Sequence, residues 1–142
     1  DRADIMAAGR GLQEDVEKYG FKGLRMEPFM GRKPPTDACY YPLYAKCIEL
    51  DIPVNIHCSV NFSVDTAMDF GKPQFLDEVM VHFPELRVCA APPGWPWVHE
   101  LVAVAWRHPN VYISLAPVRP NRPPGAKLQP LPRDAPRWPQ PW

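Results

Sequence analysis

Apolar residues recur along this chain in two alternating patterns, one with the period of a helix and one typical of short buried strands. Steps of three and four residues between apolar positions predict helices over 5–19, 41–50, 75–83 and 97–107. Short apolar runs bounded by Gly, Pro or polar residues predict strands over 21–27, 52–58, 86–91 and 110–115. The predicted order is therefore a helix, then strand and helix in alternation, then a last strand.

The predicted strands are spaced like repeating βα units. Strand starts near Phe21, Pro53, Leu86 and Asn110 lie 32, 33 and 24 residues apart. Consecutive βα units with right-handed crossovers build either an open doubly wound sheet or a closed (β/α)8 barrel. No GxGxxG or GxxxxGKS/T motif follows a strand, which excludes the usual dinucleotide and P-loop interpretations. A complete barrel needs about 250 residues. We therefore predict the α/β class, with about four parallel strands and their helices forming part of a (β/α)8 TIM barrel.

His57 ends one of these runs, at the position where parallel α/β folds usually place functional side chains. It could bind a metal, or its ring could simply be satisfied by a backbone carbonyl, and the residues alone leave both open. Side chains alternate along a strand, so His57 and Cys58 are expected to point to opposite faces of the sheet. The other histidines fall in or just after helices, and we predict structural roles for His82, His99 and His108.

Further candidate residues follow the first and third predicted strands. Glu27 could bind a divalent metal with the strand-end histidine, or could be only a loop carboxylate. Arg25 could recognise a carboxylate substrate. Trp95 and Trp97 could line a substrate pocket, or anchor the core or a subunit interface. One histidine and one glutamate are fewer than the three protein ligands that a catalytic zinc site requires.

Composition limits the class of partner and the compartment. The formal net charge is +0, which gives no argument for nucleic acid or an anionic membrane as partner. No apolar run approaches the roughly 18 residues of a membrane span. The 4 cysteines form no CxxC pair, which favours reduced thiols in a cytoplasmic protein. The first residue is Asp1 and no signal-peptide pattern follows it, so we expect the sequence to start inside a longer chain.

Proline divides the chain into a body, residues 1–120, and a tail, residues 121–142. The chain has 20 prolines, and they are densest beyond residue 116, where neither helix nor sheet is expected. We predict an irregular Pro- and Arg-rich tail. One hypothesis is that the tail is an out-of-frame translation of a GC-rich gene; the alternative is a genuine proline-rich linker or ligand segment. The coding DNA distinguishes the two.

Five stretches of the chain carry a resemblance to a known family. They are GFKGLRMEPF at 20–29, YYPLYAKC at 40–47, IPVNIH at 52–57, GWPW at 94–97 and RHPNVYI at 107–113. In order and spacing they resemble the amidohydrolase-related family, the branch of the metal-dependent amidohydrolase superfamily that includes aminocarboxymuconate-semialdehyde decarboxylase-like enzymes. The resemblance runs from about the N-terminus to Pro120.

The resemblance implies a (β/α)8 barrel that holds a divalent metal, usually zinc, in the full-length parent. It implies ligands from an HxH after the first strand, a His after the fifth and an Asp after the eighth, and His57 matches the fifth-strand ligand. Many members have a histidine at the end of the sixth strand, where this chain reads AAPPG at 90–94. The implied function is hydrolysis or decarboxylation of a small carboxylate or amide-like substrate, in a possible homo-oligomer. The alternative is a non-catalytic barrel-derived module used for binding or assembly.

Overall fold

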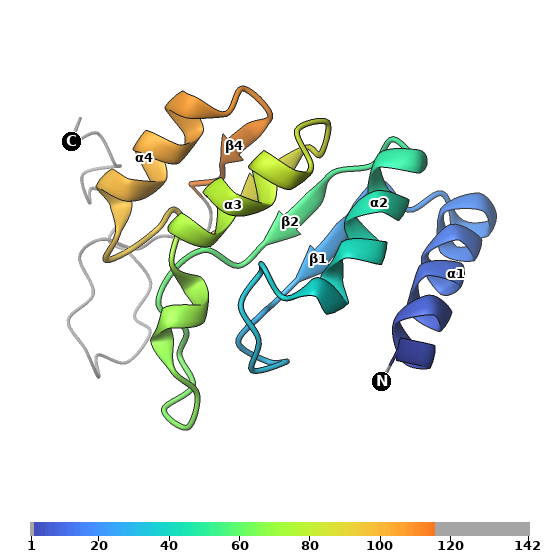
Figure 1. Cartoon of the computed structure of the whole chain (residues 1–142), viewed down its shortest axis with the longest axis horizontal. Coiled ribbons are helices and arrows are strands. Elements are labelled where there is room, and N and C mark those ends of the chain that lie inside the picture. Colours follow the sequence, from blue (N-terminus) through green and yellow to red (C-terminus); the bar gives the residue numbers. More distant parts are fainter. Residues whose placement is uncertain (1, 116–142) are drawn as a thin grey trace, which may run out of the picture.

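The structure, a computed structural model, describes residues 2–115. Helices and strands alternate along them after a first helix (Figure 1). In chain order the elements are α1 (Arg2–Tyr19), β1 (Leu24–Met26), the 3-10 helix η1 (Ala38–Tyr40), α2 (Tyr41–Glu49), β2 (Val54–Ile56), the 3-10 helix η2 (Met68–Gly71), α3 (Gln74–His82), β3 (Val88–Ala90), α4 (Val98–Arg107) and β4 (Val111–Ile113). The predicted tail and the boundary at residues 120 and 121 lie outside the described residues.

The strands form one parallel sheet in the order β1-β2-β3-β4. Figure 1 shows α2, α3 and α4 along one face of this sheet, and α1 beside α2. This arrangement follows from the βα repeats, because each crossover helix must bury its apolar side on the strands that it connects. The prediction of about four parallel, adjacent strands with their helices is confirmed.

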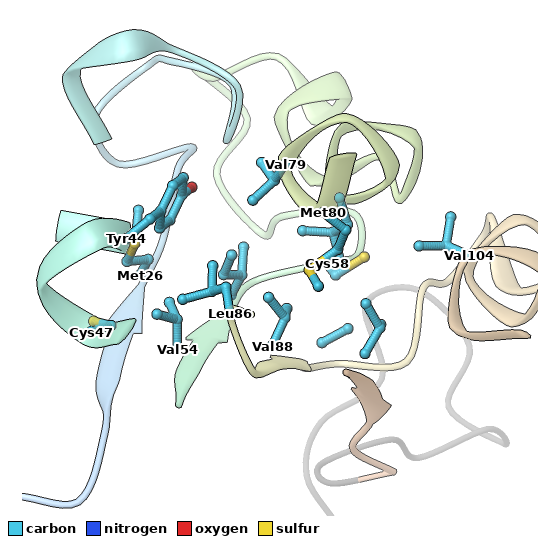
Figure 2. Close-up of a cluster of buried hydrophobic side chains, with 14 of the residues drawn as sticks. Met26, Tyr44, Cys47, Val54, Cys58, Val79, Met80, Leu86, Val88 and Val104 are labelled. Carbon is cyan, nitrogen blue, oxygen red and sulfur yellow. The ribbon is translucent and has the colours of Figure 1, made fainter. Parts of the chain in front are cut away.

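The register of the sheet separates two kinds of residue. Val54 on β2 pairs with Val88 on β3, and Ile56 with Ala90; all four side chains are completely buried under the helices. Leu76, Val79 and Leu101, from α3 and α4, complete this core, part of which is drawn in Figure 2. The alternate residues form a row on the opposite face, and this row consists of Arg25, Asn55, Cys89 and Tyr112.

The element ends differ slightly from prediction. Each strand has 3 residues, fewer than the apolar runs suggested. Trp97 is the N-cap of α4, so Pro96 precedes the helix instead of lying in its first turn. The short helices η1 and η2 lie in segments for which no helix was predicted, and the Asp37 side chain accepts a hydrogen bond from Cys39 N at the start of η1. Local capping of this kind leaves no apolar periodicity in the sequence.

Two of the histidines predicted to be structural, His82 and His108, make contacts between helices. His108 Nε2 lies 2.6 Å from Asp77 Oδ1, and Arg107 Nη1 donates to Asp77 Oδ2 at 3.0 Å, so α3 is tied to the end of α4. His82 packs against the ring of Tyr41. Both contacts agree with the structural roles predicted for these histidines. Within residues 2–115, every helix is too short or too polar to cross a membrane.

Candidate functional site

The backbone aligns four residues at the C-terminal edge of the sheet. His57 N donates to Met26 O at 2.9 Å, Ala91 N to Ile56 O at 3.1 Å, and Ser114 N to Ala90 O at 2.9 Å. These bonds continue the parallel ladder one residue past each strand. They place Glu27, His57, Ala91 and Ser114 side by side, and we call this set the strand-end row. Because side chains alternate, the row faces away from the helices, as Arg25 does.

His57 is the buried ionisable member of the strand-end row. Its side chain is almost enclosed, and its Nε2 atom has no hydrogen-bond partner among the described residues. Burial lowers the pKa of His57, and the Arg25 charge acts in the same direction, whereas backbone hydrogen bonding at Val60 and Ser59 and the charge of Glu27 oppose the shift. The ring is therefore held neutral near pH 7, which is the form that binds a metal.

Arg25 and Glu27 lie next to this histidine as an ion pair. Arg25 Nε and Nη2 both donate to Glu27 Oε1, at 3.0 and 2.7 Å. Both charges act on the pKa of His57, so the structure brings together these three predicted site residues. A substrate carboxylate reaching Arg25 would share or displace its partner Glu27. The site can thus offer one neutral nitrogen, one carboxylate and one guanidinium.

The predicted tryptophans belong to a loop that is bonded to the loop following β2. Ser59 Oγ and Val60 N donate to Trp95 O at 2.7 and 2.8 Å, and Gly94 N donates to Cys58 O at 2.8 Å. The Trp95 ring is exposed, whereas Trp97 is half-buried, with Lys72 Nζ 5.9 Å from its ring centroid. The backbone of Trp95 therefore supports the site directly, and its ring is free to meet a ligand.

The donor set among residues 2–115 is small. No group of three or more His, Cys, Asp or Glu side chains in this part of the chain could hold a metal ion together. The unpartnered Nε2 of His57 fits the role of one metal ligand, since a buried ring nitrogen costs free energy unless it is paired. The other members of the strand-end row, Ala91 and Ser114, are not metal ligands that zinc usually selects.

Two aromatic residues at the site were not predicted from the sequence. The Phe29 ring lies edge-on to the His57 ring, with centroids 4.8 Å apart. Phe62 lies edge-on to Phe29 at 5.8 Å and is itself largely exposed. The dipeptide Pro28-Phe29 directly after Glu27 was the available signal, because a loop residue next to a candidate ligand is well placed to touch the site.

The cysteines are expected to react with iodoacetamide at very different rates in the native chain at pH 8. Burial raises the pKa of Cys58 to about 12 and that of Cys47 to about 11, so few thiolates form there. Cys89 lies half-buried on the face of the sheet opposite the helices and should react first, at least about a hundredfold faster than Cys58. Peptide mass spectrometry over time measures the order, and the urea-denatured chain, in which all should react, is the control. Equal rates at Cys58 and Cys89 in the native chain would contradict the burial described above.

Comparisons with known proteins agree with the predicted fold, a part of a TIM barrel. The family described as amidohydrolase matches residues 7–141. A 2-keto-4-carboxy-3-hexenedioate hydratase from Sphingobium sp. is 39% identical over 62 residues, which cover 40% of this chain and 18% of the hydratase. An uncharacterized TIM-barrel protein from Bordetella bronchiseptica has a TM-score of 0.65 and 26% identity, over 81% of this chain and 48% of the barrel. The chain thus spans less than half the length of either protein. From the match over nearly all of its length, the chain belongs to the amidohydrolase family.

Proposed function

We propose that this chain supplies part of the active site of a metal-dependent amidohydrolase-type hydrolase or lyase. The observation that carries the proposal is the Nε2 atom of His57 at the carboxyl end of a parallel strand, which is buried and has no hydrogen-bond partner among residues 2–115. In barrels of this type, functional groups lie at that end of the strands. The proposed substrate is a small carboxylate or amide-like molecule. The proposed compartment is the cytoplasm, in keeping with the free thiols of Cys39, Cys47, Cys58 and Cys89.

The residues of this chain would divide the work at the site. His57 would be one ligand of a divalent metal, zinc in the first instance, with Glu27 as a candidate second. When bound, such a metal supplies an activated water and polarises a substrate oxygen. Arg25 would orient a substrate carboxylate, since a guanidinium matches a carboxylate in geometry and charge. The rings of Trp95 and Trp97 would form an apolar wall. The remaining ligands would come from parts of the protein beyond residues 2–115.

The relative's name suggests a third type of reaction at such a site. The Sphingobium protein is a hydratase, so it adds water to a substrate that bears carboxylates. Hydration, hydrolysis and decarboxylation of small carboxylates all need an anchored carboxylate and a polarised oxygen. The pair Arg25 and Glu27 beside His57 suits any of the three. We propose a carboxylate-bearing substrate, with hydration as the lyase-type alternative to decarboxylation.

Zinc content of the purified protein tests the assignment of His57. The whole protein that carries this sequence should hold near-stoichiometric zinc, and the His57→Ala variant should lose most of it, because a site that loses one of its few ligands loses most of its affinity. The His99→Ala variant is the matched control, since His99 is exposed on α4. Unchanged zinc in His57→Ala, with normal folding by circular dichroism, would contradict the proposal.

The chain of residues 1–142 alone should bind zinc only weakly, because its described residues offer one histidine and one carboxylate at the site. Near-stoichiometric zinc on this chain that disappears in His57→Ala would show that further ligands lie within it.

A second candidate function is a non-catalytic binding or assembly module, which Ala91 at the position of a family histidine favours. That alternative would be supported if the purified whole protein held no metal and still bound a ligand at the carboxyl edge of the sheet.

A further inference from the structure

We propose that Phe29 is a positioning residue that fixes the orientation of the His57 imidazole. The two rings meet edge to face, with centroids 4.8 Å apart and an interplanar angle of 67°. Both side chains are buried, Phe29 almost completely. Edge-to-face aromatic contacts are favourable and depend on geometry, so this contact stabilises one ring orientation over others.

Phe29 is itself held rigidly, as a positioning residue must be. Its own segment is a compact turn in which Met30 N donates to Glu27 O at 2.9 Å, Arg32 N to Phe29 O at 3.2 Å, and Lys33 N to Pro28 O at 3.3 Å. Phe62 packs edge-on against Phe29 from another loop. The ring of Phe29 therefore lies between a hydrogen-bonded turn, a second aromatic ring and the imidazole.

The imidazole needs such support because hydrogen bonding alone restrains it weakly. The Nε2 atom of His57 has no hydrogen-bond partner among residues 2–115, so at most one nitrogen of the ring is bonded within them. The torsion that turns an imidazole is broad, and a ring bonded at one nitrogen can still rotate. The contact with Phe29 limits that rotation and keeps Nε2 in one direction. This positioning has functional value only if His57 is the ligand proposed above.

Chemical modification of His57 in the whole, metal-free protein tests the role of Phe29. Diethyl pyrocarbonate carbethoxylates neutral imidazole nitrogens, and peptide mass spectrometry resolves His57 from the other histidines. Phe29→Leu keeps an apolar side chain and removes the aromatic ring that meets the imidazole. We expect carbethoxylation of His57 to become about two- to tenfold faster, and the imidazole ¹⁵N signals to broaden or average, because the lost contact no longer favours one orientation. His99 should react at an unchanged rate.

Two matched variants separate positioning from loss of packing. Phe83→Leu removes an aromatic ring that packs edge-on to Tyr41 and Tyr44, away from His57. Phe62→Leu removes a ring that contacts Phe29. Phe83→Leu should leave His57 reactivity unchanged, and Phe62→Leu should change it less than Phe29→Leu. The proposal would be overturned if the folded Phe29→Leu variant showed an unchanged rate of His57 carbethoxylation. It would also be overturned if Phe83→Leu accelerated that reaction as much as Phe29→Leu does.

If Phe29→Leu does not fold, a second variant and a second measurement still test the proposal. Phe29→Met keeps a long, adaptable apolar side chain and should give the same acceleration. In the unmodified protein, nuclear Overhauser contacts between the Phe29 and His57 rings should be strong, and their absence would overturn the proposal. The readouts need no metal. A protein without zinc would therefore contradict the proposed function, while the modification rates still decide the role of Phe29.

Discussion

Replacing Gly71 with alanine is expected to destabilise the chain by about 3 kcal/mol or more. A Cβ atom at Gly71 would lie 1.8 Å from Ser59 O and 2.7 Å from Ser59 C, both backbone atoms. A side-chain tip could rotate away, but the backbone of Ser59 cannot move without disturbing its bond to Trp95 O. The loop after β2 and the adjoining His57 should therefore shift together. Urea denaturation followed by circular dichroism measures the free energy of unfolding.

Gly11→Ala is the matched control for this substitution. Gly11 lies in α1, and a Cβ atom there would meet nothing within 4 Å. Alanine in a helix interior is favoured over glycine by about 1 kcal/mol, so this variant should be slightly more stable. A Gly71→Ala chain that unfolds at the same urea concentration as the parent would contradict the close approach of η2 to Ser59.

Truncating Tyr44 to alanine should cost about 3–5 kcal/mol of folding free energy, the usual cost of deleting a buried aromatic ring. Tyr44 is completely buried on α2, and its ring packs edge-on to Phe83 at 5.5 Å. Its hydroxyl donates to Pro35 O at 2.8 Å, which anchors the loop between β1 and α2. Burial raises the pKa of this phenol, so it remains a neutral donor. The free energy of unfolding of the variant gives the measurement.

Tyr44→Phe separates the hydrogen bond from the packing. It keeps the ring and leaves the buried Pro35 carbonyl without its donor, at a cost of about 1–2 kcal/mol. Tyr112→Phe is the control, because Tyr112 is exposed on the opposite face of the sheet and should change stability by less than about 0.5 kcal/mol. Equal losses in Tyr44→Phe and Tyr44→Ala would mean that the ring contributes nothing through packing.

The sequence predicts the fold well where local pattern and global packing impose the same requirement. The apolar run that ends on His57 has to form a strand covered by helices, and its spacing from the neighbouring runs requires parallel pairing, as observed. The position of His57 at the strand end follows from the same pattern. The opposite orientations of His57 and Cys58 also follow from it, since Cys58 belongs to the core and His57 contacts Phe29.

The loops around the site were less predictable because distant residues determine their geometry. Ser59 and Trp95 are bonded although they lie 36 positions apart, and no local signal announces such a bond. The contact of Phe29 with His57 depends on the turn that begins at Glu27, and that turn is set by backbone bonds within the loop. Strand length was overestimated for a related reason: apolar residues beyond the ladder, such as Ile52 and Cys58, are buried in the hydrophobic core although they lie outside the paired strand.

The strict alternation of the sheet has a consequence for how this edge could evolve. Residues such as Val54 and Val88 are committed to the core, whereas Ala91 and Ser114 lie in the strand-end row and face away from it. Mutations of the core-facing residues therefore change mainly the stability of the fold, and mutations in the strand-end row change mainly the chemistry of the edge. Selection can act on the two properties through different codons of the same strand. A lineage could exchange the chemistry of this edge one residue at a time while the packing beneath it stayed intact.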